Sequence, residues 1–256
     1  MTDSSGGDLM REMAVLRLRR EESTSEVLLS AGAAVSFEGC QPWRTFRWRQ
    51  GQAHYSGLYW SAVTGGHVGY ESRLELAWLL LADREPGLRA IISQPFQLTA
   101  IVEGRQRRHV PDFLTIAADG AVTVVDVKPA RRLADAAVAF TFGWARRVVE
   151  AQGWRFQVAS EPEATLLANV RFLAGYRRAW QFQSAVLDAI TNSLTAPATW
   201  SQVAHAATGL AGDRDRGRAH LLHLLWSGRL QVGLDEPLSE TSVITPGGKV
   251  GAAWRG

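Results

Sequence analysis

The sequence predicts an α/β core with a mixed sheet, followed by a smaller helical domain that ends in a hairpin. Two observations indicate this fold class. Residues 70–160 read as helix, hairpin, strand, helix and strand in turn, which is the order of an α/β domain. After about residue 178 the strand patterns stop, and three helical stretches precede two short strands, which is the order of a winged helix. With 46% hydrophobic residues in a chain of 256, there is enough apolar surface for a buried core.

We therefore predict three parts: a weakly ordered N-terminal arm over 1–41, an α/β domain over 42–177 and a winged-helix-like domain over 178–256. The arm holds one short basic helix candidate, MREMAVLRLRREE. The chain starts without a basic and then apolar signal pattern. Its single cysteine, Cys40, excludes an internal disulfide and favours a reducing compartment. A bacterial cytoplasmic location is the expectation.

Arginines alternate with aromatic residues in the segment that opens the α/β domain, PWRTFRWRQGQAHYSGLYWSA. In a strand, Phe46 and Trp48 would face one side while Arg47 and Arg49 face the other. Such interleaving is typical of surfaces that bind nucleic-acid backbones. A half-buried hairpin whose aromatic residues cover the core explains the pattern equally well, and both interpretations stay open.

The elements that follow are predicted from periodicity and turn residues. A helix of about three turns over YESRLELAWLLLADREPG ends at Pro86-Gly87. Strands are expected at 95–102, 109–116, 121–128 and 154–160, with a hairpin turn at AADGA and a helix over LADAAVAFTFGWARRVVEAQG that stops at Gly153. A connecting helix over EATLLANVRFLAGYRR leads to the C-terminal domain.

Glu75 lies inside the first of these helices, between Leu74 and an apolar run that continues to Ala82. A helix that is apolar nearly all round is normally buried. An ionised carboxylate in such a place must be paired, bind a metal or become neutral. A glutamate on the helix rim that pairs with an arginine is the ordinary alternative.

Asp112 and Asp126 are predicted to face each other across the hairpin. If Ala118-Asp119-Gly120 is a three-residue loop with Gly120 left-handed, the numbers of facing residues sum to 238, which pairs Asp112 with Asp126. Facing carboxylates repel each other, and a divalent cation between them would convert that repulsion into coordination. A two-residue turn would shift this register by one.

Lys128 follows Asp126 by two residues on the same strand, so both side chains point to one face. Only two of the 28 basic residues are lysines, Lys128 and Lys249. Beside metal-bound carboxylates an ammonium can position a water or help to deprotonate it, whereas arginine does not lose its proton. The order Glu75, Asp112, Asp126 and Lys128, with PDF at 111–113 and DVK at 126–128, is the PD-(D/E)xK signature of the restriction-endonuclease-like fold.

The residues around this signature resemble the TnsA endonuclease subunit of heteromeric, Tn-seven-type transposases. The resemblance rests on SRLELAWLL, PDFL, VVDVKPA, RRVVEAQGWRFQVASEPE and NVRFLAGYRR, and covers about 42–180. It implies catalytic roles for Glu75, Asp112 and Lys128. Asp126 stands at a position that varies between acid and amide in that family.

The resemblance further implies a Mg²⁺-dependent DNA endonuclease in which Mn²⁺ can substitute for Mg²⁺. Such a subunit cuts the 5′ ends of a transposon, while a TnsB-like DDE transposase cuts and joins the 3′ ends and a TnsC-like AAA+ ATPase couples both to target selection. The metal would be held by Glu75, Asp112 and Asp126. A stand-alone restriction or repair nuclease of the same fold, and a non-enzymatic winged-helix DNA-binding adaptor, are the alternatives.

Several arginines are candidate phosphate contacts, although a solvated charge is the more ordinary interpretation of any one of them. They are Arg47, Arg49, Arg105, Arg107, Arg108, Arg131 and Arg132. In the C-terminal domain, Arg214, Arg216 and Arg218 would suit a DNA groove, but nearby aspartates dilute their charge. His220 and His223 have a spacing that could ligate a metal, but their leucine-rich surroundings favour ordinary positions on a buried helix face.

Overall fold

The computed structural model describes residues 14–21, 23–29, 34–44 and 55–247. The chain divides into two compact units. The first comprises Met1–Trp78 and Leu88–Glu161, and the second comprises Leu79–Gly87 and Pro162–Gly256. The observed division after Glu161 therefore differs from the boundary predicted at 177/178. No helix among the described residues is long and apolar enough to cross a membrane.

A four-stranded mixed sheet in the first unit carries Asp126, and Asp112 directly precedes one of its strands. Its order is β10-β9-β8-β5, and only β10 and β9 run parallel. The strands are β5 (Leu88–Ser93), β8 (Phe113–Ala117), β9 (Val122–Val127) and β10 (Arg155–Ala159). The mixed α/β character predicted from the sequence is therefore confirmed for this unit.

A second four-stranded sheet corrects the prediction of a weakly ordered N-terminal arm. Its order is β2-β1-β6-β7, with β1 (Val15–Arg19), β2 (Thr24–Leu28), β6 (Gln97–Val102) and β7 (Arg105–His109). Within the segment interpreted as a basic helix, Val15–Arg19 form a strand, because Leu16 and Leu18 alternate with Arg17 and Arg19 and are each 1% exposed. The described part of the predicted arm thus belongs to the core.

Strand β5 and most of β7 were not predicted, and one predicted strand is divided. Of the expected strand over 109–116, His109 belongs to β7 and residues 113–116 belong to β8, because Pro111 and Asp112 lie between the two sheets. In addition, β3 (Gly57–Ser61), at the end of the aromatic segment, pairs with β4 (Gly66–Tyr70) in a separate two-stranded hairpin.

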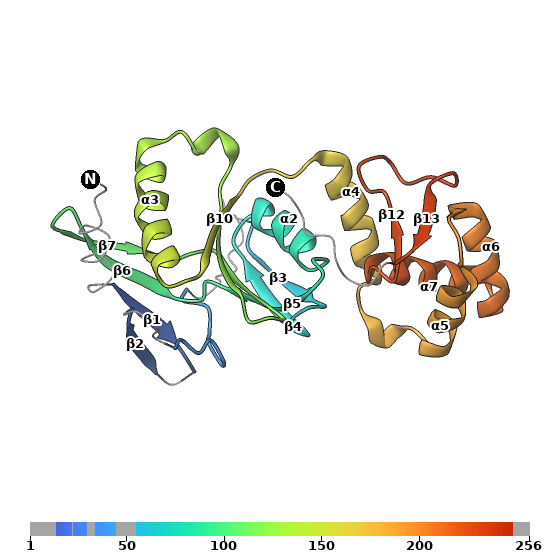
Figure 1. The fold of residues 1–256 in the computed structure, drawn as a ribbon, viewed down its shortest axis with the longest axis horizontal. Coiled ribbons are helices and arrows are strands. Elements are labelled where there is room, and N and C mark those ends of the chain that lie inside the picture. Colours follow the sequence, from blue (N-terminus) through green and yellow to red (C-terminus); the bar gives the residue numbers. More distant parts are fainter. Residues whose placement is uncertain (1–13, 22, 30–33, 45–54, 248–256) are drawn as a thin grey trace. The chain divides into compact units, whose positions relative to one another are not determined.

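Helix α3 (Ala136–Ala151) covers the core of the first unit (Figure 1). Trp144, Ala145, Val148 and Val149 on α3 are at most 3% exposed and pack in one cluster with residues of β1, β6, β8 and β9. Gly153 has a φ of +81°, so the left-handed residue that ends this helix is where the sequence predicted it.

The second unit consists of helices and a small three-stranded sheet of order β11-β13-β12. Its elements are α4 (Ala164–Leu173), α5 (Ser184–Ser193), β11 (Ala198–Thr199), α6 (Trp200–Ala211), α7 (Arg214–Trp226), β12 (Leu230–Val232) and β13 (Val243–Pro246). Leucines 221, 222, 224 and 225 are fully buried and Trp226 is 3% exposed, so this leucine-rich face forms the core of the unit.

His220 and His223 are core residues of α7, as their surroundings predicted. Their side chains are buried, and both rings pack against Phe182. His223 Nδ1 lies 2.7 Å from the Tyr176 carbonyl oxygen, and His220 Nδ1 lies 2.7 Å from that of Arg216. Burial lowers the pKa of His223, which favours the neutral ring.

Candidate active site

The β8–β9 hairpin brings Asp112 and Asp126 to the same end of the sheet. Phe113 pairs with Val125 and Leu114 with Val124, so the numbers of paired residues sum to 238 as predicted. Gly120 has a φ of +87°, and its N–H donates to the Ala117 carbonyl oxygen, which closes the three-residue loop. One step beyond the last pair, Asp112 Oδ2 accepts a 2.7 Å hydrogen bond from the Val127 N–H.

Lys128 extends β9 by one residue and is fixed through its backbone. Its N–H donates to the Ala159 carbonyl oxygen of β10 at 2.8 Å, and its own carbonyl oxygen accepts from Ser160 Oγ at 2.8 Å. The ammonium charge lowers the pKa of both Asp112 and Glu75, although for each carboxyl other effects are larger. Lys128 therefore interacts electrostatically with two of the acidic residues with which the sequence grouped it.

Glu75 is not the unpaired carboxylate that the sequence suggested. Its Oε2 accepts from the Glu71 N–H at 2.7 Å and its Oε1 from Ser72 Oγ at 2.9 Å, while Ser72 Oγ accepts from the Glu75 N–H at 3.1 Å. Ser72 and Glu75 thus form a reciprocal cap at the start of α2 (Arg73–Ala82). The motif Ser-x-x-Glu signals this cap in the sequence, and it was overlooked.

The carboxyl groups of the site have too little positive charge around them to offset their burial and mutual repulsion. Burial raises the pKa of Asp112 to about 8, and the neighbouring carboxylates of Asp126 and Glu75 add to this effect. Burial also raises the pKa of Glu75, against the hydrogen bonds from Glu71 and Ser72 that lower it. Asp112 therefore lies within electrostatic reach of Asp126, Glu75 and Lys128, and Glu75 lies within reach of Lys128.

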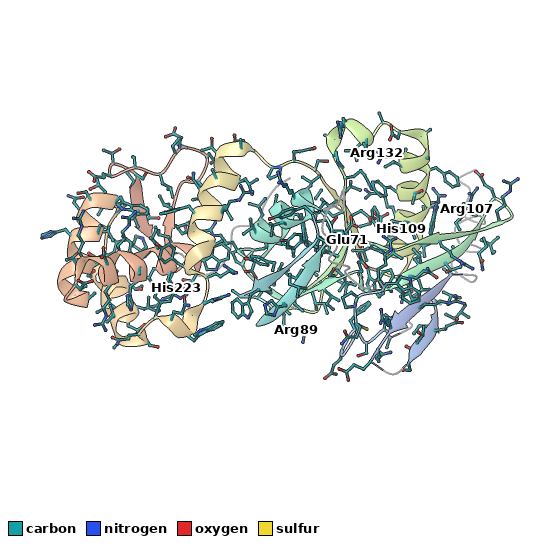
Figure 2. The ribbon with its side chains drawn as sticks, turned by 180° about the vertical axis from the view of Figure 1, so that it is seen from behind. Glu71, Arg89, Arg107, His109, Arg132 and His223 are labelled. Carbon is teal, nitrogen blue, oxygen red and sulfur yellow. The ribbon has the colours of Figure 1, made fainter. Side chains whose placement is uncertain are left out.

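His109 is a site residue that sequence reasoning missed. Its Nε2 lies 2.8 Å from Asp126 Oδ2 and 3.1 Å from Oδ1, and the two side chains are 14% and 3% exposed. The ring also meets Phe142 and Trp144 edge to face, at centroid distances of 6.3 and 6.2 Å. His109, which is labelled in Figure 2, ends β7, in the other sheet, so spacing along the sequence does not reveal its contact with Asp126.

The carboxylates of the site match the ligands that Mg²⁺ prefers, namely hard oxygen donors. Burial, with the Asp126 and Glu75 carboxylates beside it, raises the pKa of Asp112, so its ionised form lacks sufficient neutralising charge. The predicted set of three metal ligands is not assembled as a unit, however. Across the described ranges, no group of three or more His, Cys, Asp or Glu side chains is placed to hold a metal ion. Both oxygens of Glu75 are instead engaged in the helix cap.

The arginines predicted to contact DNA lie in different structural environments. Arg107 faces aromatic residues of α3, with its guanidinium carbon 5.1 Å from the centre of the Phe140 ring. Arg108 is exposed and donates to Gln106 Oε1. Arg131 is exposed in the 3-10 turn Ala130–Arg132, and Arg132 pairs with Asp135 at 3.1 Å. Arg47 and Arg49 lie outside the described residues.

Comparison with known proteins adds one finding. Residues 85–161 match the family described as TnsA-like endonuclease N terminal, and this range includes Asp112, Asp126, Lys128 and His109. None of the curated proteins matches the chain. The matched range begins just before β5 and ends at the last residue of the first unit. This part of the chain is therefore similar to the N-terminal domain of TnsA-like endonucleases.

Proposed function

We propose that the chain is the metal-dependent endonuclease subunit of a heteromeric, Tn-seven-type transposase, and that it cuts the 5′ ends of the transposon. The observation that carries this proposal is the β8–β9 hairpin. It sets Asp112 beside Asp126, with Lys128 next along β9, inside a range that matches TnsA-like endonucleases. The core would then be restriction-endonuclease-like, and the three helices and small sheet of the second unit would be winged-helix-like.

Asp112 and Asp126 are the residues that would hold the metal. Mg²⁺ is usually bound by one or two carboxylates together with waters and substrate phosphates, so two aspartates suffice. Mn²⁺ would substitute. When bound, the metal supplies Lewis-acid stabilisation of the phosphate and a bound water of lowered pKa. Glu75, which the sequence grouped with these ligands, would instead act through the outer hydration sphere or through its charge.

The chain's own residues orient the reacting groups. Lys128 would hold the attacking water or neutralise charge that develops on the phosphate, because its ammonium lies within electrostatic reach of Asp112 and Glu75. His109 would fix the orientation of the Asp126 carboxylate through its 2.8 Å contact. The Val127 N–H does the same for Asp112.

Cleavage of transposon-end duplexes tests this proposal. The chain is incubated with Mg²⁺, with and without a TnsB-like DDE transposase and a TnsC-like AAA+ regulator. We expect 5′-strand cutting only with the partners, and its loss in Asp112→Asn. Asp119→Asn, in the turn of the same hairpin, is the matched control. Cutting by the isolated chain would indicate a stand-alone nuclease, and unchanged cutting by Asp112→Asn would refute the assigned site.

The second unit is proposed to recruit the AAA+ regulator, because Glu75, Asp112, Asp126 and Lys128 lie in the first unit, as does the matched range apart from residues 85–87. Two exposed leucines allow a matched comparison: Leu210 of α6 is 44% exposed, and Leu58 of β3 is 52% exposed. In a pull-down of the regulator, we expect Leu210→Asp to weaken capture more than Leu58→Asp. The reverse result would assign recruitment to the first unit.

A further inference from the structure

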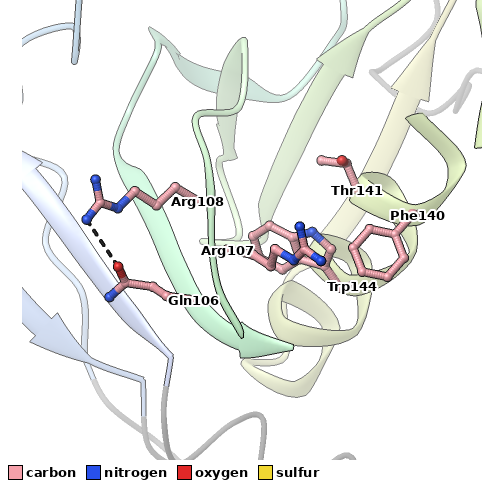
Figure 3. Close-up of a pocket in the computed structure, with 6 residues that line it drawn as sticks. All are labelled: Gln106, Arg107, Arg108, Phe140, Thr141 and Trp144. Carbon is pink, nitrogen blue, oxygen red and sulfur yellow. Dashed lines mark hydrogen bonds between the residues drawn. The ribbon is translucent and has the colours of Figure 1, made fainter. Parts of the chain in front are cut away.

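A pocket of about 470 Å³ opens between β7 and the N-terminal half of α3. It is lined by Gln106, Arg107, Arg108, Phe140, Thr141 and Trp144 (Figure 3). None of these residues is acidic, and two are arginines. The charge of the lining therefore favours an anionic ligand.

The aromatic residues of the pocket do not offer faces on which a nucleobase could stack. The guanidinium carbon of Arg107 lies 5.1 Å from the centre of the Phe140 ring, so the cation covers one face of that ring. Trp144 is only 2% exposed. A base would have to displace Arg107 to stack here, whereas a compact anion could bind the guanidinium where it stands.

Arg107 is held by this ring and not by an acceptor. Its Nε atom is buried without a hydrogen-bond partner. Within the described part of the chain, its guanidinium takes part in no hydrogen bond or ion pair. A buried donor left unpaired costs free energy, and the guanidinium fork matches the geometry of a phosphate. The neighbouring Arg108 is bonded to Gln106 at 3.1 Å, so Arg107 is the arginine left for a ligand.

The pocket lies next to the candidate active site along β7. Arg107 and His109 are two residues apart on this strand, so they share a face and lie about 6.6–6.8 Å apart along it. His109 contacts both Trp144 of the pocket and Asp126 of the site. Since nucleotides of one strand rise by about 3.4 Å each along the helix axis, a phosphate at Arg107 would lie one or two nucleotides from a phosphate at the candidate active site.

We propose that this pocket binds a backbone phosphate of the DNA strand that is cut, one or two nucleotides from the scissile phosphodiester, with Arg107 as its ligand. This subsite rests on the proposed function, because it takes DNA as the substrate. In this proposal, Arg107 and His109 of β7 have different roles. Arg107 positions the strand, and His109 orients a carboxylate of the catalytic group.

DNA binding without cleavage tests the subsite. Full-length chain carrying Asp112→Asn is titrated with a fluorescent duplex in EDTA, by anisotropy, over a range of salt concentrations. Adding Arg107→Gln should weaken binding about tenfold and reduce the slope of log K against log salt by about 0.9, the value for one lost phosphate contact. Arg107→Lys should keep the slope but weaken binding, because the charge remains and the fork is lost.

The matched control is Arg155→Gln. Arg155 is exposed at the start of β10, opposite Thr123, whereas the acidic end of β9 lies opposite Val158 and Ala159. We expect the slope of log K against log salt for Arg155→Gln to equal that of the parent. An unchanged slope in Arg107→Gln, or equal losses in both variants, would refute the subsite and leave the nuclease intact. If millimolar inorganic phosphate, added at constant ionic strength, displaces the duplex, the pocket would be assigned to free phosphate. Absence of salt-dependent duplex binding by the parent would refute subsite and function together.

Discussion

At the scale of single residues, Asp112 shows most directly what this site requires. The carboxyl is buried, faces two other carboxyl groups and has its pKa raised to about 8. A folded protein gains nothing from such a group unless a cation or a proton neutralises it. In the metal-free protein a proton does so, and this has a measurable consequence for stability.

The free energy of unfolding of the metal-free protein is expected to fall as the pH rises from about 4 to about 8. In this window Asp112 stays protonated in the folded state, while the unfolded state, with its ordinary pKa of 3.8, has lost the proton. The unfolded state therefore binds fewer protons and is favoured by rising pH. Asp112→Asn should remove this dependence and be more stable than the parent at pH 8. Urea unfolding in EDTA at several pH values measures it.

Asp119→Asn, in the exposed hairpin turn, is the control and should keep the parent's pH dependence. Equal slopes for the parent and Asp112→Asn would contradict the burial assigned to Asp112. Added Mg²⁺ should stabilise the parent more at pH 8 than at pH 5, because metal and proton compete for the same carboxylate.

His109→Ala should destabilise the protein strongly, by about 3–5 kcal/mol, because it leaves the buried Asp126 carboxylate without its partner. The double variant His109→Ala with Asp126→Asn should recover part of this loss, since the amide carries no charge. Chemical denaturation of the four proteins of this cycle measures the coupling. Additive effects would show that the pair contributes no specific interaction.

At the scale of elements, the sequence predicts most where an interaction is local. The three-residue turn with Gly120 determines the register of β8 and β9, and counting outward from the turn gives the observed pairs as far as Phe113 with Val125, one step before Asp112 and Asp126. The grouping of Lys128 with Asp126 on one face follows from the two-residue period of the strand. His109 could not be found in this way, because its contact with Asp126 joins two different sheets. The Ser72–Glu75 cap was local and visible, but the metal hypothesis for Glu75 obscured it.

The error over the N-terminal segment has a different cause. Arginine alternating with leucine was interpreted as a basic helix, although its period of two is that of a strand with one buried face. The partner of β1 that supplies the core is β6, more than 70 residues later, in the register Leu16 with Leu98. Only this pairing with a strand distant in the sequence identifies the alternation of arginine and leucine as that of a half-buried strand.

Two leucines of the β1–β2 hairpin test its place in the core. Leu16 is 1% exposed, whereas Leu28 is 56% exposed. We expect Leu16→Ala to lower the free energy of unfolding by about 2–5 kcal/mol and Leu28→Ala by less than about 0.5 kcal/mol. Thermal and chemical unfolding of both variants gives the comparison. A small effect at Leu16 would restore the view of this segment as a loose arm.

At the scale of the whole molecule, α2 belongs to both units. Residues up to Trp78, including Glu75, group with the first unit, and Leu79–Gly87 group with the second. Arg84 is part of this second segment. Its Nη2 donates to the Leu225 carbonyl oxygen at 2.9 Å and its Nε to that of Trp226 at 3.3 Å. These carbonyls end α7, where helices lack internal donors.

A chain truncated after residue 178 should therefore fold poorly. Because the strands predicted for the α/β core end by residue 160, the sequence by itself favours the opposite expectation, namely that such a fragment keeps its Glu75–Lys128 geometry. In the structure, however, Leu79 and Leu80 are 0% and 5% exposed within a segment that groups with residues 162–256. Truncation would expose these leucines and remove the acceptors of Arg84. We expect a lower melting temperature and aggregation relative to the full chain.

Substitution of Arg84 separates this effect from the general cost of truncation. In the full chain, Arg84→Met keeps the length of the side chain but removes its donors, and should lower the free energy of unfolding by about 1–3 kcal/mol. Arg89→Met, at an exposed position of β5 (Figure 2), should change it by less than about 0.5 kcal/mol. If the fragment melts at the temperature of the full chain and Arg84→Met matches Arg89→Met, then α2 folds without the second unit, and Glu75 is positioned by the first unit alone.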